Sequence, residues 1–439
     1  MPITIIIEPR VGNVDVSRRV TVQGLAPDER VEIGVTTRGN DGAKWTAHPV
    51  YSADSEGSVD LARDAPVQGD YQDVDVDGFF WSQALVEQAA APIPAGRQQV
   101  RPISVEITVR GSAGVLAKDT FEQSFLAPGV RRTHLDQDGF VGTLFVPGSV
   151  GPHPVIVVLN GSGGGVNEER AALLAAHGFA ALALGYFGAP GLPAHISSTP
   201  LEYFERALKW LHREFKPLVD FIAVMGQSRG GELSLLLASE YPDLVSAVVA
   251  YVPSSVVHGV LAAGYPGENR FAPAWTRAGK PLTTVWAQNE VAQAWASIDR
   301  QSEPRRQSQA FVEAQKNPDA VSLARIPVEK IRGPVLLLSG GDDGYWPSTA
   351  YARHIEQQLH DHRHPHEVLR LDYPDAGHFI QHPLVPTTVI ARAHPVSGIV
   401  MTGGGTPAAN ARANRESWPQ CVDFLRRSVA TLRNRLNPT

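Results

Sequence analysis

Cysteine, long apolar runs and clusters of basic residues are nearly absent from this sequence. Its 439 residues include a single cysteine, Cys421, which cannot form a disulfide within the chain and provides no thiolate set for zinc. No apolar run approaches the roughly 18 residues of a membrane-spanning helix, and the N-terminal residues lack the features of a secretory signal peptide. The 39 basic and 45 acidic residues form no basic stripe suited to nucleic acid. We therefore predict a soluble, cytoplasmic protein that has neither nucleic acid nor a membrane as partner.

Charge and apolar patterning divide the chain near residue 130. Residues 1–130 contain 11 basic and 18 acidic residues, whereas residues 131–439 contain 28 and 27. In the first region short β-rich runs alternate with turn residues, which is typical of an immunoglobulin-like β-sandwich. In the second region apolar strands alternate with helices, which predicts an α/β domain with a doubly wound, mostly parallel sheet. This alternation stops over residues 254–325, which we interpret as a lid or pocket insertion.

The strongest chemical signal is the segment Gly226-Gln227-Ser228-Arg229-Gly230, which lies between a predicted apolar strand and a predicted helix. A G-x-S-x-G segment alone is a weak signal, but between a strand and a helix it is typical of the nucleophile elbow of α/β-hydrolases. Glycine on both sides permits the tight turn that lifts the serine hydroxyl above the sheet. We predict that Ser228 is a nucleophile.

A serine nucleophile needs a base, and the base needs an orienting carboxylate. In α/β-hydrolases both follow the serine along the chain, the acid before the histidine. Two aspartates, Asp342 and Asp343, follow one apolar strand, and His378 follows another. We predict His378 as the base and Asp343 as the acid, because Asp343 stands between a tight turn and a proline that starts a helix; Asp342 is the alternative.

The glycine-rich loop 160–165 is predicted to complete an oxyanion hole. The backbone N–H of Arg229 is one expected donor, and the backbone N–H of Ser162 or Gly163 is the other. The loop does not match a phosphate-binding loop, since it lacks both the Gly-Lys-Ser/Thr ending and the third glycine of a dinucleotide-binding motif. Tyr186, at the end of the next predicted strand, is a further candidate for substrate binding.

Two clusters of potential metal ligands are better interpreted as solvated loops. Residues 70–77 carry four aspartates without EF-hand spacing, and residues 360–366 carry four histidines among charged residues and a proline. Cys421 lies on an amphipathic C-terminal helix beside apolar residues and is predicted to be packed. We therefore predict no metal and no redox cofactor.

Ten segments, which include the elbow and the loops already described, are spread over essentially the whole chain and form a recognisable set. They are RVTVQGLAPDERVEI, YSADSEGSVDLARDAP, DGFFWS, FLAPGVRR, NGSGGGVNEERAALLAAHGFAALALGYFG, GQSRGGELSLLLAS, IPVEKI, GDDGYWPS, AGHFI and GGTPAANARANRESWPQCVDFL. In this order they resemble the acyl-CoA thioesterase and bile acid-CoA:amino acid N-acyltransferase family. The resemblance implies an N-terminal β-sandwich and a C-terminal α/β-hydrolase domain. The nucleophile, acid and base of the family fall on Ser228, Asp343 and His378.

The resemblance also implies that the substrate is an acyl-CoA or a related carrier-bound acyl thioester. Serine at position 228 favours hydrolysis, since the amino-acid transferases of the family often have cysteine there. Transfer of the acyl group to an amine or alcohol, and hydrolysis of a carboxylester or lactone, remain alternatives. A catalytically silent binding module is disfavoured because the triad is complete.

Substrate contacts outside the triad are less well defined by the sequence. Trp81, in DGFFWS, is either a border of the acyl site or a buried aromatic. The Arg229 side chain is long enough to reach the substrate. The phosphates of CoA call for basic residues, and the insertion and its surroundings offer Arg270, Arg277, Lys280, Arg305 and Arg306.

Overall fold

The computed structural model describes residues 2–39, 42–88 and 100–436, and the chain forms two compact units. Unit 1 contains the described residues up to Ala127 together with His382–Val389. Unit 2 contains the remainder from Pro128. The division after Ala127 lies close to the predicted boundary at residue 130. The assignment of His382–Val389 to unit 1 was not predicted.

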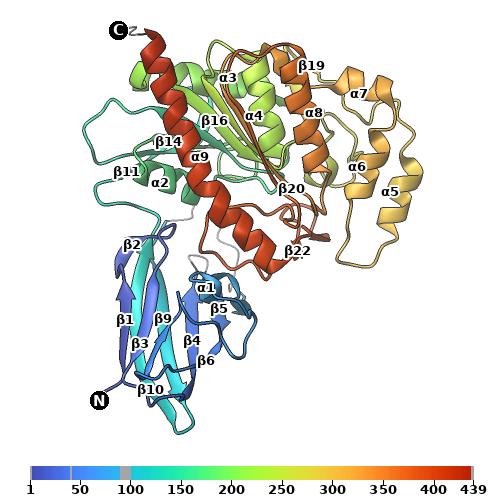
Figure 1. Cartoon of the computed structure of the whole chain (residues 1–439). Coiled ribbons are helices and arrows are strands. Elements are labelled where there is room, and N and C mark those ends of the chain that lie inside the picture. Colours follow the sequence, from blue (N-terminus) through green and yellow to red (C-terminus); the bar gives the residue numbers. More distant parts are fainter. Residues whose placement is uncertain (1, 40–41, 89–99, 437–439) are drawn as a thin grey trace. The chain divides into compact units, whose positions relative to one another are not determined.

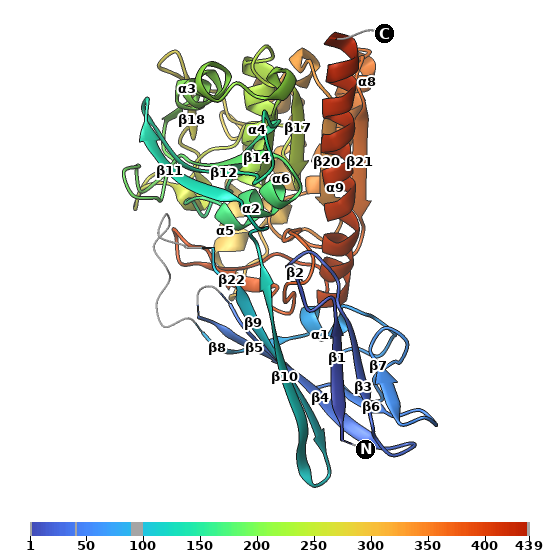
Figure 2. The same cartoon turned by 90° about the vertical axis from the view of Figure 1, so that its left-hand side faces the viewer.

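Unit 1 is a β-sandwich, as predicted (Figures 1 and 2). One sheet has the strand order β1 (Thr4–Glu8), β3 (Arg19–Gln23), β7 (Ser58–Asp60). The other has the order β2 (Val11–Asn13), β10 (Gly114–Ser124), β9 (Ile103–Gly111), β4 (Arg30–Arg38), β5 (Lys44–Ala47), β8 (Ala84–Glu87), with β6 (Val50–Ser52) paired to β4. Alternate residues of both sheets, such as Val20, Val22, Ile33 and Ile107, share one buried core.

The segment 382–389 joins unit 1 through packing and backbone hydrogen bonds. Leu384 is buried in the apolar core of the sandwich. The Thr387 N–H donates to the Trp81 carbonyl at 3.1 Å, next to the short helix α1 (Gly78–Trp81). Such a contact links residues about three hundred positions apart, so no local sequence pattern indicates it.

Unit 2 contains the predicted α/β sheet. Its strand order is β11 (Arg131–Gln137), β12 (Phe140–Val146), β14 (Ala180–Gly185), β13 (Val155–Leu159), β16 (Ile222–Gln227), β17 (Ala247–Tyr251), β20 (Val335–Gly340), β21 (Val368–Tyr373). The first two strands run antiparallel to their neighbours, and the strands from β14 onward run parallel to one another. Because the central strands are covered on both faces, every residue of β13, β14, β17 and β20 is buried. The predicted α/β-hydrolase class is confirmed.

Helices cover this sheet. They are α2 (Glu168–Ala176), α3 (Leu201–Trp210), α4 (Arg229–Glu240), α8 (Ser348–Asp361) and α9 (Pro407–Leu436), with short helical turns at Leu211–Phe215, Leu218–Asp220 and Val328–Lys330. Figure 1 shows α9 crossing the sheet on the near side, where it contacts β17, β20 and β21. Cys421 on α9 is fully buried, and burial raises the pKa of its thiol to about 11. The thiol is therefore packed, as predicted.

The insertion 254–325 is ordered and has an aromatic core of its own. It contains Leu261–Ala263, β18 (Trp275–Arg277), β19 (Lys280–Pro281), α5 (Ala292–Asp299), α6 (Ser308–Ala314) and α7 (Pro318–Ala324). Strands β18 and β19 form a small sheet with β15 (Thr199–Pro200), and β22 (Ala391–Ala393) pairs with β23 (Val400–Thr402). Trp286, Trp295 and Phe311 pack together, and Trp346 from unit 2's main body joins them. The insertion is thus built onto the hydrolase unit by buried aromatic contacts.

In the described ranges, no helix has both the length and the apolar character needed to cross a membrane. Within the same residues, no group of three or more histidine, cysteine, aspartate or glutamate side chains is arranged to hold a metal ion. The aspartates of residues 70–77 and the histidines of residues 360–366 are among these residues.

Candidate active site

Ser228 lies at the sharp turn between strand β16 and helix α4. Its backbone has φ 59° and ψ −119°, a conformation that residues with a Cβ rarely adopt. A Cβ atom on Gly226 would lie 2.1 Å from the Gly230 carbonyl oxygen, and one on Gly230 would lie 2.6 Å from the Asn160 carbonyl oxygen. The two glycines of the motif are therefore required by close backbone approach. The turn has the geometry of a nucleophile elbow.

Asp343 and His378 meet at the carboxyl ends of the neighbouring strands β20 and β21. The Nδ1 atom of His378 lies 2.9 Å from Oδ1 and 2.8 Å from Oδ2 of Asp343, and both side chains are buried. Oδ1 also accepts hydrogen bonds from the backbone N–H groups of Tyr345 and Trp346, at 2.9 and 3.2 Å. An ionised Asp343 can only accept, so Nδ1 of His378 carries the proton and Nε2 is left free to act as a base.

The His378 ring is held in place by several further contacts. The Tyr345 ring stacks on it with centroids 4.5 Å apart and an angle of 18° between planes. Its backbone N–H donates to the Gly403 carbonyl at 2.9 Å, and its carbonyl accepts from Nε2 of Gln227 at 3.2 Å. Gln227 precedes Ser228, so this last hydrogen bond ties the histidine loop directly to the elbow.

Asp342, the alternative acid, has different partners. Its Oδ2 accepts from the Gly405 N–H at 2.7 Å and its Oδ1 from Nη2 of Arg306 at 2.7 Å. Its side chain is 49% exposed, whereas that of Asp343 is 1% exposed. The geometry therefore favours Asp343 as the partner of the histidine.

The glycine-rich loop after β13 lies directly beside the elbow. A Cβ atom on Gly161 would lie 3.5 Å from Cβ of Ser228. The N–H groups of Gly161, Gly164 and Gly165 are engaged by acceptors within the loop or on Phe187. In the part of the chain that the structure describes, no acceptor binds the N–H of Ser162 or Gly163. These two groups are available for an oxyanion, and so is the N–H of Arg229, because the first N–H groups of a helix have no partner within it.

Tyr186 supports this loop. Its hydroxyl donates to the Asn160 carbonyl at 2.7 Å, and its ring packs against Phe187, Phe204 and Trp275. The side chain is buried, and burial raises the pKa of the phenol above its usual range. In this structure Tyr186 positions the loop; its predicted role in binding substrate stays a prediction.

Trp81 lies in unit 1. Its indole N–H donates to Oδ2 of Asp75 at 2.9 Å, and its ring lies against Tyr71 with centroids 5.7 Å apart. These contacts correspond to the structural alternative, a buried aromatic. Its predicted role at the acyl site stays a prediction.

The Arg229 side chain is not free to reach a substrate, contrary to our expectation. It is 2% exposed and pairs with Glu232 at 2.9 Å. Its guanidinium also donates to the Gly259 carbonyl at 2.6 Å, and Glu232 accepts from Nε1 of Trp275 at 2.8 Å. Burial raises the pKa of Glu232, and the charge of Arg229 opposes that shift. The pair ties the first turn of α4 to the insertion.

Arg229→Met is expected to lower the free energy of unfolding by about 3–5 kcal/mol, because it leaves the Glu232 carboxylate buried without its counter-charge. Urea denaturation followed by circular dichroism measures this loss. Arg332→Met is the matched control, because Arg332 pairs with Asp243 at the surface and is expected to change stability by about 1 kcal/mol or less. Equal losses in the two variants would contradict the structural role of the buried pair.

Comparison with known proteins places the chain in a family. The model for the C-terminal region of BAAT and acyl-CoA thioester hydrolases matches residues 199–431, and the model for the N-terminal region of the same proteins matches residues 15–137. Human acyl-coenzyme A thioesterase 1 is 33% identical over 98% of this chain and 97% of its own length. The chain belongs to the acyl-CoA thioester hydrolase/BAAT family. The resemblance noted in the sequence is confirmed.

A second relative agrees with this membership. The human protein named acyl-coenzyme A thioesterase 2, mitochondrial, is 33% identical over 98% of this chain and 85% of its own length. Among solved structures, the puromycin-hydrolysing peptidase of Mycobacterium tuberculosis has a TM-score of 0.44 at 12% identity and covers 94% of this chain and 65% of that one.

Two cavities of this thioester hydrolase family member share lining residues, and the small one contains the nucleophile. A small one, of about 20 Å³, is lined by Ser162, Ser228, Arg229, Leu261, Ala262, Gln307, Tyr345, Trp346, His394 and Met401. A larger one, of about 370 Å³, shares Leu261, Ala262, Gln307 and Met401 with the small one. The shared residues connect the nucleophile to a space large enough for part of a ligand.

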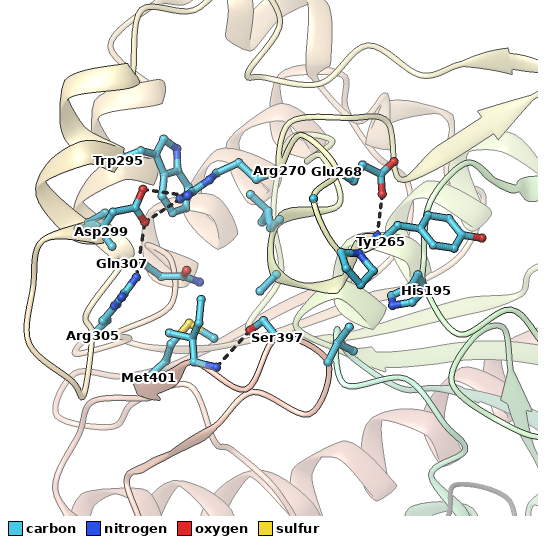
Figure 3. Close-up of a pocket in the computed structure, with 18 residues that line it drawn as sticks. His195, Tyr265, Glu268, Arg270, Trp295, Asp299, Arg305, Gln307, Ser397 and Met401 are labelled. Carbon is cyan, nitrogen blue, oxygen red and sulfur yellow. Dashed lines mark hydrogen bonds and ion pairs between the residues drawn. The ribbon is translucent and has the colours of Figure 1, made fainter.

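The larger cavity combines apolar and basic side chains (Figure 3). Figure 3 shows Arg270 and Arg305 both directed at Asp299. Their guanidinium nitrogens lie 2.8 and 3.6 Å from its carboxylate oxygens. The Arg270 guanidinium also lies over the Trp295 ring, 4.8 Å from its centroid. The two arginines were among the phosphate ligands predicted from the sequence. Gln307, His394 and Met401 were not predicted. No local motif marks those residues, which reach the site through the insertion and the segment 390–402.

Proposed function

We propose that this protein hydrolyses acyl-CoA thioesters through an acyl-Ser228 intermediate. The observation that carries the proposal is the buried Asp343–His378 pair, tied by Gln227 to an elbow serine. The relatives that cover nearly the whole chain are named acyl-coenzyme A thioesterases. The names of these relatives support an acyl-CoA as the substrate class, and the residues of the site support hydrolysis by a serine nucleophile.

In the proposed reaction His378 removes the hydroxyl proton of Ser228 as its oxygen attacks the thioester carbonyl carbon. The carbonyl electron pair moves to the oxygen, where the N–H groups of Arg229 and of Ser162 or Gly163 donate to it. Collapse breaks the carbon–sulfur bond, and His378 gives its proton to the departing thiolate, which leaves as the thiol. His378 then takes a proton from a water that attacks the acyl carbon, and it gives this proton to Oγ of Ser228 as the bond between the acyl carbon and Oγ breaks and the carboxylic acid leaves. Apart from the substrate and this water, the steps use side chains and backbone N–H groups of the chain.

The larger cavity is our candidate for the part of the substrate next to the thioester. Arg270 and Arg305 share a single carboxylate, Asp299, so two positive charges there are balanced by one negative charge. A partly compensated pair of guanidinium groups suits a phosphate of CoA. The apolar wall formed by Trp295, Ile298 and Met401 suits an acyl or pantetheine chain.

Intact-protein mass spectrometry tests the function. The full chain is mixed with acyl-CoAs of increasing length, with and without glycine or taurine, and both the protein mass and the products are followed. We expect an acyl adduct on Ser228 that decays to free acid regardless of the amine. Amide formation would instead make the protein an acyltransferase. Adducts from p-nitrophenyl esters or lactones but not from CoA esters would identify a carboxylester or lactone hydrolase.

The location of the protein is a separate proposal. We propose that it acts in the cytoplasm, as the sequence composition suggests, although relatives from human, rat and mouse carry a mitochondrial name. Fractionation of cells that express the chain tests this point.

A further inference from the structure

A buried histidine of the segment 390–402 contacts the oxyanion loop. Nε2 of His394 lies 2.9 Å from Oγ of Ser162, and both residues line the small cavity with Ser228. His394 is 4% exposed. Nothing in the triad mechanism uses either side chain, since the expected contribution of Ser162 is its backbone N–H. A buried polar pair facing a nucleophile therefore needs an explanation.

The hydrogen bonds of His394 determine which ring nitrogen carries its proton. The backbone N–H groups of Val396 and Ser397 both donate to Nδ1, each at 3.3 Å. An atom that accepts two N–H groups has no proton of its own, so the neutral ring is protonated at Nε2. Burial, together with the charges of Arg392 and Arg229, lowers the pKa of His394 to about 4, which keeps the ring neutral near pH 7.

The direction of the contact with Ser162 follows from this tautomer. Nε2–H of His394 donates, and Oγ of Ser162 accepts. The hydroxyl proton of Ser162 must then point to another acceptor. Across the described residues 2–39, 42–88 and 100–436, no protein acceptor for that proton is found. The hydroxyl therefore has a free donor beside the small cavity that it shares with Ser228.

The surroundings of that cavity favour an anionic acceptor. Helix α4 begins there, and the free N–H groups of its first turn give its N-terminus a partial positive charge. The charge of the Arg229 guanidinium is balanced by the buried Glu232 carboxylate, so the helix N-terminus is the positive feature at this place. It stabilises a negative charge that develops on an oxygen between Ser228 and Ser162.

We propose that the Ser162 hydroxyl is a third donor to the oxyanion, and that His394 is the positioning residue that turns this hydroxyl toward it. The inference rests on the proposed function for the identity of the substrate. It does not rest on it for the chemistry, because any ester that acylates Ser228 passes through the same kind of oxyanion. In the tetrahedral intermediate the carbonyl oxygen takes the electron pair and accepts the Ser162 O–H, while the Ser228 proton is on His378. No bond of Ser162 or His394 is made or broken.

The same geometry excludes a second nucleophile. For Ser162 to attack a substrate, His394 would have to take its proton at Nε2, yet that atom already carries one. Nδ1 faces two backbone donors, unlike Nδ1 of His378, which faces Asp343. His394 therefore lacks the orienting carboxylate that a general base requires.

Ser162→Ala tests the donor. Acylation of Ser228 by p-nitrophenyl acetate, followed by stopped-flow absorbance, and steady-state turnover of an acyl-CoA are both measured on the full chain. We expect both rates to fall by about 100-fold, with KM changed by less than about threefold, because the donor acts on charge that is present only in the transition state. Ser162→Thr, which keeps a hydroxyl, is expected to recover most of the rate. Ser239→Ala, which removes another buried serine hydroxyl from the same unit, is the control.

His394 variants test the positioning. His394→Phe removes the donor to Ser162, and we expect it to lower kcat about as much as Ser162→Ala does. The double variant is expected to be no slower than either single one, because both act through the same hydroxyl. His394→Gln retains an N–H near the position of Nε2 and is expected to restore at least part of kcat. If His394→Phe does not fold, the proposal is tested with His394→Gln, Ser162→Ala and Ser162→Thr.

The outcomes separate this inference from the proposed function. Ser162→Ala with unchanged acylation by p-nitrophenyl acetate would overturn the inference, even if acyl-CoA is the substrate. So would additive losses in the double variant, since additivity would indicate two independent roles. A wild-type protein that is acylated by p-nitrophenyl acetate but turns over no acyl-CoA would contradict the proposed function, while the Ser162 comparison would still decide the inference.

Discussion

Ser228→Ala is expected to lower kcat/KM for an acyl-CoA by about four powers of ten or more, because it removes the oxygen that forms the acyl-enzyme. The residual rate would come from the oxyanion donors and from substrate binding, which the substitution leaves in place. Release of CoA, followed with a thiol reagent, measures the loss. Mass spectrometry of the same variant should show no acyl adduct. A variant that keeps substantial turnover would contradict the assignment of the nucleophile.

Ser228→Gly provides the matched control for stability. The backbone at position 228 has φ 59°, which is unfavourable for any residue with a Cβ. Ser228→Ala retains this strain, whereas Ser228→Gly relieves it, so the glycine variant should be more stable by about 1 kcal/mol. Both variants should be inactive. Loss of activity without loss of stability would show that the effect is chemical.

The parts of the structure that the sequence predicted are those governed by local chain geometry. The largely apolar runs that became β13, β14 and β20 indicated a covered parallel sheet, because such strands need helices on both faces. The elbow was predictable because only glycine fits where Gly226 and Gly230 approach other backbone. Asp343 and His378 could be paired because residues that follow neighbouring parallel strands meet at one edge of the sheet.

The parts that could not be predicted depend on contacts between distant residues. Ser162 and His394 are 232 positions apart, and neither lies in a motif that specifies the other. The Arg229 side chain was predicted to be long enough to reach the substrate. The sequence does not reveal that this side chain is buried and bonded to Glu232 and to the Gly259 carbonyl. The segment 382–389 joins the β-sandwich through Leu384, which no periodic apolar pattern in that short segment marks as a core residue. Each of these outcomes was decided by tertiary packing.

Asp343→Asn is expected to lower kcat by about four powers of ten, because it moves the proton of the neutral His378 ring from Nδ1 to Nε2. Oδ1 of Asp343 accepts the N–H groups of Tyr345 and Trp346, so the oxygen of an asparagine amide would keep that position. The amide nitrogen would then stand where Oδ2 is, 2.8 Å from Nδ1 of His378, and donate to it. Nδ1 would lose its proton to Nε2, and Nε2 could no longer accept the proton of Ser228.

Asp342→Asn is the control that distinguishes the two neighbouring acids. Asp342 binds the Gly405 N–H and Arg306, and a change there leaves the tautomer of His378 unaffected. We expect this variant to keep kcat within about threefold, with a small loss of stability because its ion pair is half exposed. Steady-state kinetics of both variants, measured at a temperature where both are folded, decides which aspartate is the acid. Activity lost in Asp342→Asn and kept in Asp343→Asn would transfer the acid role to Asp342, and the hydrogen bonds of His378 would then have to rearrange in the working enzyme.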